Sequence, residues 1–167
     1  MPQAEYSSTA SPRRLPEAIA LFNSAFATEL LVNACWFKSQ HGSEGLPWPA
    51  AFLILPLTLH PPTRQELPRD SRLTLAAWAV AHPQLTADMD HRVAVMAEPT
   101  KRAIRRGLRV GRLGLVGTNL VALAKPRNPT AAWPEELATS TRAARICGRW
   151  FNGIQTAFAL ELLGIGK

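Results

Sequence analysis

Cationic side chains cluster in the middle of the chain, and their residue types suit the recognition of an anion. They are Lys101, Arg102, Arg105, Arg106, Arg109 and Arg112. Arginine carries a planar fork of N–H donors that matches a phosphate or a carboxylate. No acidic residue stands between Glu98 and Glu135, so the adjacent sequence does not neutralise this charge. We predict that these side chains contact nucleic-acid phosphates or an acidic protein partner.

A solvated helix face is the simpler explanation of the same cationic cluster, because arginine stems can cover apolar surface while their heads stay in water. Close pairs of like charges on a helix, however, cost about 0.2–0.5 kcal/mol each. A cluster without interleaved acids is therefore unfavourable unless an anionic partner compensates it. We place the functional interpretation ahead of the solvated face.

A second basic stripe is predicted near the C-terminus, beside bulky apolar side chains. The residues that we assign to a partner interface are Arg142, Arg145, Arg149, Trp150 and Phe158. The arginines fall at helical spacing, and aromatic side chains beside arginine are typical of interface hot spots. Protein contact, DNA contact and plain solvation remain equal alternatives for the arginine stripe.

The sequence gives little support for catalysis. It lacks the Gly-x-x-x-x-Gly-Lys phosphate loop, and its four histidines are scattered. Cys35 and Cys147 lie in apolar helical sequence, which favours buried thiols over a metal site or a disulfide framework. We expect no enzyme activity, no cofactor and no metal.

Residues 86–124 must position the first cationic cluster, and their pattern predicts a winged helix-turn-helix-like unit. A helix is expected to begin at Thr86, and a second, basic helix at Pro99-Thr100, because proline is favoured in the first helical turn. Gly107 and Gly111 are expected to end the basic helix. Two short apolar runs around Gly117-Thr118-Asn119 then indicate a β-hairpin.

The remainder of the chain predicts a mainly α fold with one small hairpin. Residues 1–15 are expected to form a flexible arm, and residues 16–167 a single domain with C-terminal helices over 133–164. The 167 residues carry a net charge of +7 and are 47% hydrophobic, which indicates a real core and anionic partners. Apolar runs are short and interrupted, so we expect a cytoplasmic protein without a transmembrane helix.

Four landmarks in the sequence resemble the middle component of bacterial three-component ABC-ATPase systems, a group that includes the Lamassu anti-phage defence. They span nearly the whole chain in a fixed order. They are Leu21-Phe22-Asn23-Ser24-Ala25-Phe26, Leu53-Ile54-Leu55-Pro56-Leu57-Thr58-Leu59-His60-Pro61-Pro62-Thr63-Arg64, Arg145-Ile146-Cys147-Gly148-Arg149-Trp150-Phe151 and Phe158-Ala159-Leu160-Glu161-Leu162-Leu163-Gly164. The family usually has Asn-Pro where this chain has Asn23-Ser24; serine also starts helices.

The resemblance implies a non-catalytic coupling or scaffold subunit. Such a subunit would link an SMC-like ABC ATPase to an effector, often a nuclease, in a defence complex that acts on DNA. An autonomous winged-helix DNA-binding regulator is the alternative, in which the basic helix enters a major groove from a symmetric dimer. That helix contains no Asn or Gln, the side chains that read adenine, which favours the coupling interpretation.

Overall fold

The computed structural model describes residues 23–39, 44–70 and 72–166. The predicted flexible arm, residues 1–15, lies outside this part of the chain. The helices are α2 (Ser24–Ser39), α3 (Trp48–Leu59), α4 (Pro61–Gln65), α5 (Leu75–Ala81), α6 (Pro83–Thr86), α7 (Met89–Arg109), α8 (Glu135–Trp150) and α9 (Thr156–Leu162). The strands are β1 (Leu46–Pro47), β2 (Leu113–Val116) and β3 (Asn119–Ala122). The predicted fold class, mainly α with a small hairpin, is confirmed.

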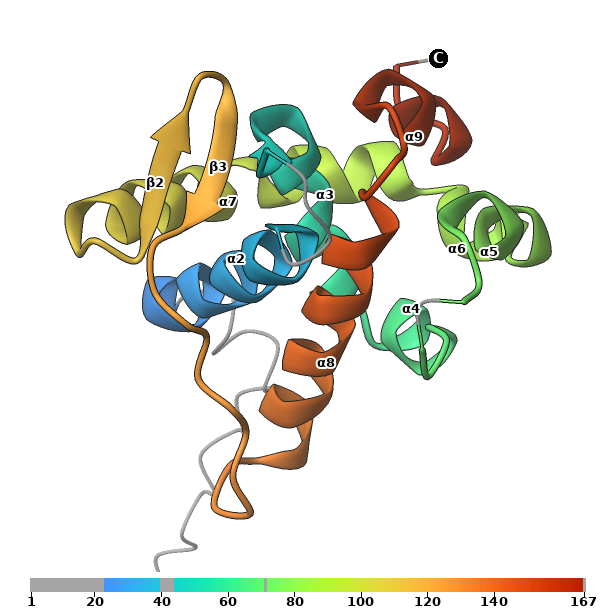
Figure 1. The fold of residues 1–167 in the computed structure, drawn as a ribbon. Helices are drawn as coiled ribbons and strands as arrows, with labels where there is room; N and C mark the ends of the chain where they lie inside the picture. Colours follow the sequence, from blue (N-terminus) through green and yellow to red (C-terminus); the bar gives the residue numbers. More distant parts are fainter. Residues whose placement is uncertain (1–22, 40–43, 71, 167) are drawn as a thin grey trace, which may run out of the picture.

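Helix α2 lies in the middle of the molecule, between α7 and α8 (Figure 1). The Oδ1 atom of Asn23 accepts hydrogen bonds from the backbone N–H groups of Ala25 and Phe26, so Asn23 caps the start of the helix. The helix is apolar on most sides, and its buried residues include Leu30, Leu31 and Val32. A helix of this kind must be covered on several faces, and it therefore organises its neighbours.

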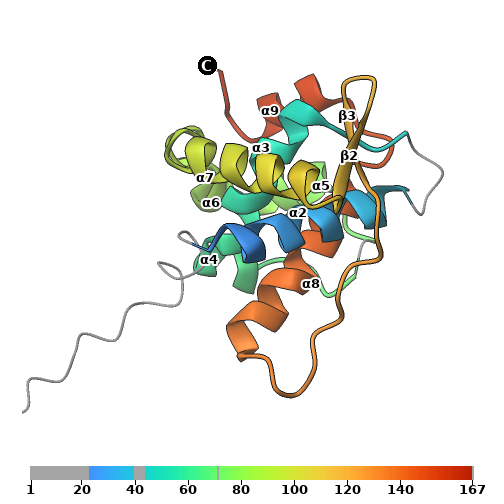
Figure 2. The ribbon, with the colours of Figure 1, turned by 90° about the vertical axis from the view of Figure 1, so that its left-hand side faces the viewer.

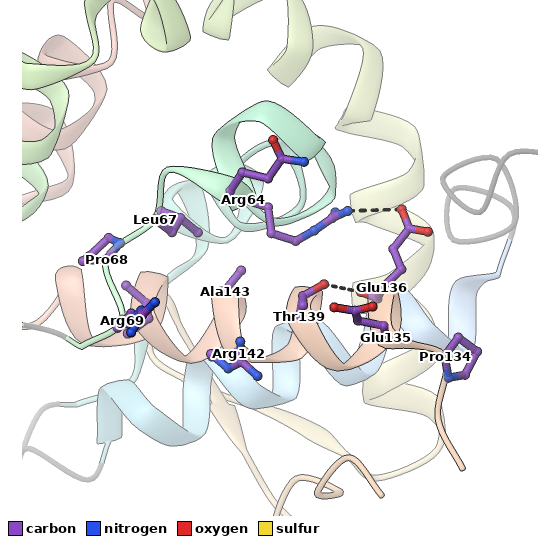
Figure 3. Close-up of a pocket in the computed structure, with 12 residues that line it drawn as sticks. Arg64, Leu67, Pro68, Arg69, Pro134, Glu135, Glu136, Thr139, Arg142 and Ala143 are labelled. Atoms are coloured by element: carbon purple, nitrogen blue, oxygen red, sulfur yellow. Dashed lines mark hydrogen bonds and ion pairs between the residues drawn. The ribbon is translucent and has the colours of Figure 1, made fainter. Parts of the chain in front are cut away.

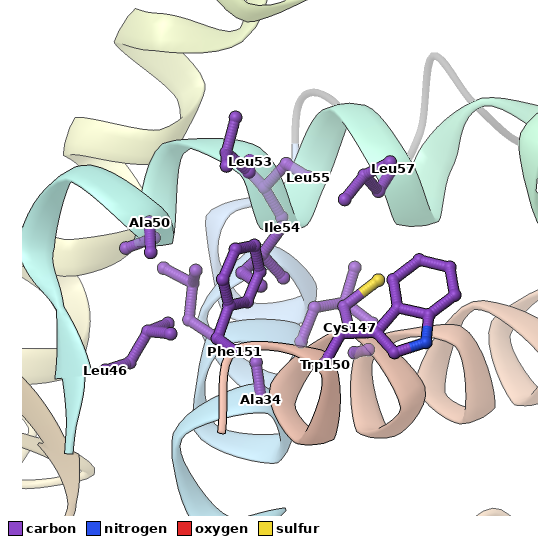
Figure 4. Close-up of a cluster of buried hydrophobic side chains, with 14 of the residues drawn as sticks. Ala34, Leu46, Ala50, Leu53, Ile54, Leu55, Leu57, Cys147, Trp150 and Phe151 are labelled. Carbon is purple, nitrogen blue, oxygen red and sulfur yellow. The ribbon is translucent and has the colours of Figure 1, made fainter. Parts of the chain in front are cut away.

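The hydrophobic core joins α2, α3 and α8. Helix α3 is buried almost all round, as its apolar sequence predicts, even though it contains Pro56. Figure 4 shows Cys147 and Trp150 of α8, with Phe151 directly after it, in the same cluster as Ile54 of α3. These side chains fill the space between the helices, so the relative position of α2, α3 and α8 is fixed by packing.

Helices α2 and α8 approach each other closely at Gly148. A Cβ atom at this position would lie 2.2 Å from the carbonyl oxygen of Ala34, which is far too short for a contact. The absence of a side chain therefore lets the two backbones meet. This gives a physical role to the glycine in the Arg145–Phe151 landmark of the sequence.

Polar side chains join α3, α4, α7 and α8 at one buried junction. Arg64 donates to the carbonyl of Thr58 at 3.1 Å, near the end of α3, and pairs with Glu136 of α8 at 3.1 Å. Arg92 of α7 donates to the carbonyl of Pro56 at 3.2 Å. The Nδ1 atom of His60 accepts from the Thr63 backbone N–H and so begins α4. Carbonyls left open at the end of α3 are thus satisfied by arginines from other elements.

The basic segment is not a separate helix, contrary to our prediction. Helix α7 continues from Met89 through Pro99 to Arg109, and Gly107 lies inside it. Met89, Met96, Ala103 and Gly107 are all buried along one helical stripe. The prediction placed a helix start at Pro99 because proline is unfavourable inside a helix. Packing of the buried stripe against α2 and α3 instead keeps α7 continuous across Pro99.

The hairpin forms where it was predicted, but it belongs to a larger sheet. Strand β3 pairs antiparallel with β2 on one side and with β1 on the other, in the order β1-β3-β2. Strand β1 is not predicted by sequence, because a two-residue strand that contains Pro47 carries no strand pattern. Figure 2 shows the hairpin at the C-terminal end of α7.

We predict that Gly148→Ala destabilises the fold by about 1–3 kcal/mol, because backbone atoms cannot easily move away from the added methyl group. Gly114→Ala on β2 is the control. The nearest atoms to its Cβ would be those of the Leu123 side chain, which is 60% exposed and has room to move. Chemical denaturation measures both. Equal stability of wild type and Gly148→Ala would contradict the close approach.

We also predict a pH dependence that arises at His60. Burial, and then the nearby positive charge of Arg92, lower the pKa of His60 from 6.5. The folded protein therefore prefers the neutral ring, and stability is present above pH 6.5 and declines as the pH falls through the folded-state pKa. His60→Asn keeps a helix-capping acceptor but cannot titrate.

Thermal melting at about pH 7.5 and about pH 5 tests this prediction, since the ordinary histidine pKa lies between them. The wild type should lose more of its Tm on acidification than His60→Asn does. Equal losses in both proteins would assign the acid sensitivity to other groups.

Candidate functional site

The C-terminal half of α7 presents a cationic face to solvent. Its arginines are exposed and fall at i, i+3, i+4 and i+7, which places them on one side of the helix, away from the buried stripe. They are Arg102, Arg105, Arg106 and Arg109, which we call the α7 arginine face. Within the described residues, none of them has a carboxylate within 4.0 Å. Glu98 interacts with Arg102 and Arg105 through space without forming an ion pair with them, and the face as a whole keeps a net positive charge.

Lys101 and Arg112 differ from the α7 arginine face, although all were predicted as one cluster. Lys101 donates to the Glu98 carboxylate at 2.7 Å. This hydrogen bond, with the charges of Lys101, Arg105 and Arg102, lowers the pKa of Glu98. The acid that immediately precedes the cationic segment thus neutralises one of its members.

Arg112 holds the structure together. Its Nη2 atom lies 2.6 Å from the Oε2 atom of Glu29 on α2, and both side chains are largely covered, with exposed fractions of 23% and 12%. The other carboxylate oxygen of Glu29 accepts from the backbone N–H of Arg127 at 2.7 Å. Glu29 thus joins α2 to the start of the hairpin and to the segment after it. Arg112 thus has a structural ion pair that the α7 arginine face lacks, and its contact with a partner stays a prediction.

The basic stripe of α8 is partly structural as well. The guanidinium groups of Arg145 and Arg149 lie 5.0 Å and 4.7 Å from the centre of the Phe37 ring. Arg145 also donates to Asn33 and to Asn128, both at 2.9 Å. Burial, and then repulsion from Arg149 and Arg142, lower the pKa of Arg145. Arg142 is the exposed member of the stripe.

Trp150 and Phe158, the predicted apolar interface residues, lie in different environments. Trp150 is 5% exposed, its Nε1 donates to the carbonyl of Leu73 at 2.7 Å, and its ring lies 5.4 Å from that of Trp78. Its side chain belongs to the core of this chain, where it offers little surface to a partner. Phe158 is 49% exposed and remains a candidate.

A groove of about 700 Å³ lies between α4 and α8 (Figure 3). Arg69 and Arg142 lie toward one end of it and Pro134 at the other, and Leu67 contributes apolar surface. The Arg64–Glu136 ion pair crosses the groove. The sequence analysis did not assign this groove, because its residues come from segments about seventy positions apart in the sequence.

Apolar side chains around the hairpin are also exposed, and the sequence analysis did not assign them a function. Leu115 and Val116 of β2 are 59% and 58% exposed, and Trp48, which follows β1, is 52% exposed. The backbone N–H of Trp48 donates to the carbonyl of Thr118 in the hairpin turn at 3.1 Å. Apolar surface thus lies close to the α7 arginine face along the chain, a combination typical of protein interfaces.

The chemistry of the buried thiols is unfavourable for nucleophilic attack. Burial raises the pKa of Cys35 and of Cys147 to about 12, so both are protonated at neutral pH. Among the described residues, no His, Cys, Asp and Glu side chains gather in a group of three or more that could hold a metal ion. No helix in this part of the chain is both long and apolar enough to cross a membrane.

The chain matches the family model described as ABC-three component (ABC-3C) system Middle Component 3 over residues 11–167. The chain belongs to this Middle Component 3 family. The resemblance found in the sequence is therefore confirmed at the level of an ABC three-component middle component. Comparisons with curated proteins and with solved structures gave no match.

Family membership changes the interpretation of the surfaces. A middle component of a three-component system works beside other subunits, so exposed charged and apolar surface on a Middle Component 3 chain is expected to meet protein as well as solvent. The α7 arginine face, Phe158, the hairpin and the α4–α8 groove are the candidate surfaces. Two of these, the groove and the hairpin side chains, emerge only from the structure.

We predict that Arg112→Ala lowers the free energy of unfolding by about 1–3 kcal/mol, because it leaves the Glu29 carboxylate largely covered without its ion-pair partner. Arg105→Ala, on the exposed face of α7, is the control and should change stability by less than about 0.5 kcal/mol. Denaturant titration measures both. If the two variants are equally stable, Arg112 does not have the structural role described here.

Proposed function

We propose that this chain is a non-catalytic coupling subunit that links an SMC-like ABC ATPase to an effector. The assembly would be an anti-phage defence complex of the Lamassu type that acts on DNA, with a nuclease as the effector. The family match over residues 11–167 is the observation that carries this proposal, because it covers nearly the whole chain. The four sequence landmarks support the link to SMC-like systems.

The interior of the protein supports a structural over a catalytic role. The buried or partly buried arginines Arg64, Arg92 and Arg145 each bond to groups that hold elements together. The two thiols are protonated, as their raised pKa requires. Hydrogen bonds from these arginines thus hold the helices in position, which suits a subunit that binds two partners and links them.

An autonomous DNA-binding regulator is the second candidate function. The order α2, β1, α3, α7, β2, β3 and the sheet order β1-β3-β2 are compatible with a winged helix into which α4–α6 are inserted. In such a unit the α7 arginine face would approach a major groove. The observation that favours this candidate is that, within residues 23–39, 44–70 and 72–166, no carboxylate forms an ion pair with these arginines.

Co-purification separates the two candidate functions. The tagged chain would be expressed with the products of its neighbouring genes and washed at ~0.5 M salt, where bare phosphate contacts are largely broken. We expect an ABC ATPase and an effector to remain bound. Elution of the chain alone, as a dimer that shifts duplex DNA at low salt, would replace the coupling proposal with the regulator.

We further predict that reversing charge on the α7 arginine face has different effects in the two cases. Arg105→Glu with Arg106→Glu should weaken retention of one protein partner if the face meets an acidic protein surface. If the face meets DNA, the same change lowers the salt dependence of DNA binding, and the slope falls by ~0.9 for each phosphate that the variant no longer neutralises.

Arg72→Glu is the exposed control for this charge reversal, because Arg72 lies outside the candidate surfaces and its side chain is 91% exposed. Retention of the partners and salt-dependent DNA binding are measured in parallel for both variants. If the double variant behaves like wild type in both assays, the α7 arginine face is a solvated surface.

A further inference from the structure

The outer edge of β2 is open. In the described part of the chain, β3 is the one strand that pairs with β2, and β1 closes the other side of the sheet. The two edges of the sheet differ in how readily they could pair with another strand. Strand β1 has two residues and contains Pro47, which makes it a poor template for another strand, whereas β2 reads Leu113-Gly114-Leu115-Val116 without charge or proline.

The hairpin register determines which backbone groups of β2 are available. Val116 pairs with Asn119 across the two-residue turn, and such flanking residues exchange hydrogen bonds. The pattern alternates along the strand, and the bond from the Leu123 N–H to the Arg112 carbonyl, 3.0 Å, fits this alternation. The N–H and C=O groups of Leu115 therefore point away from β3, toward the open edge.

A row of apolar side chains runs across the sheet and ends uncovered at this edge. Leu46 of β1 pairs with Leu120 of β3, which pairs with Leu115 of β2. Their exposed fractions are 0%, 1% and 59%. The inner face of the sheet thus continues past the core, and Leu115 offers apolar surface beside its free backbone groups.

We propose that the β2 edge binds an extended segment of a protein partner, which adds a fourth strand to the sheet and carries apolar residues flanked by acidic ones. This inference rests on the proposed function in one respect, the existence of a protein partner. Strand addition uses main-chain hydrogen bonds for affinity and alternate side chains for specificity.

The charges near β2 favour an acidic segment over a second copy of the chain. The exposed side chains of Arg106 and Arg109 lie on the helix that leads into β2, and the sequence has no acid from there to Glu135. A second copy would bring another strongly basic chain, with a net charge of +7, to the same edge. DNA is disfavoured at the edge itself, because Leu115 and Val116 present apolar side chains there.

Leu115→Pro tests the edge directly. It removes the outward N–H, which the hairpin does not use, and its ring blocks an incoming strand. Leu115→Thr keeps the N–H and the strand propensity but removes apolar surface. Val95→Ser is the matched control, since Val95 is 58% exposed on α7, away from the hairpin.

Each variant would be co-expressed with the neighbouring gene products, and affinity for each purified partner would be measured. Leu115→Pro should weaken binding of one partner at least about tenfold, because it removes a hydrogen bond and a steric fit together. Leu115→Thr should have a smaller effect and Val95→Ser none. Unchanged binding in Leu115→Pro overturns the proposal, whereas failure of the wild type to retain any partner counts against the coupling function itself.

Amide hydrogen exchange supplies a readout that does not depend on a variant folding. The Leu115 amide of the wild type should exchange fast in the isolated chain and at least about tenfold more slowly in the assembly, because a new strand protects it. Unchanged exchange at Leu115 overturns the proposal. A dimer of the isolated chain that Leu115→Pro converts to a monomer, or loss of DNA binding alone in this variant, also overturns it.

Discussion

The burial of α2 is the constraint on which the rest of the structure depends. This helix is covered by α7 and α8, and three of its polar side chains each bond to another element: Thr28 to α7, Glu29 to Arg112, and Asn33 to Arg145. A buried polar group that loses its partner is costly, so these bonds specify which elements may cover α2. The close approach at Gly148 then fixes how near α8 can lie. The hairpin and the cationic end of α7 are positioned as a consequence.

Local sequence patterns predicted the elements that form without depending on tertiary contacts. The hairpin around Gly117-Thr118 and the C-terminal helices within residues 133–164 follow from spacing and turn chemistry. Prediction was wrong where tertiary packing outweighs a local preference. Pro99 stays inside α7 because one buried stripe runs through it, and β1 exists because β3 offers it an edge. Neither cause can be seen in a short window of sequence.

Local spacing indicates which arginines share a helix face, but it does not show which of them pair with residues far away in the sequence. Spacing alone places the α7 arginine face on one side of a helix, and the structure agrees that it is exposed. Arg112 has the same residue type in the same run, but its carboxylate partner, Glu29, lies 83 positions away. Trp150 is 5% exposed and packs in the core of this chain; tryptophan serves both interfaces and cores, and sequence does not separate these uses. The sequence places Leu115 in a hairpin, but its exposure depends on where the core ends.

The central claim is that a core built on α2 presents the α7 arginine face and the hairpin to other subunits of an ABC three-component system. A cryo-EM structure of the chain, co-expressed with the products of its neighbouring genes, tests this claim most directly. We predict that protein density from a partner covers the α7–hairpin side, while α2 remains enclosed by α7 and α8. A map in which this side is free of any partner, or in which α2 is released from α8, would contradict the account.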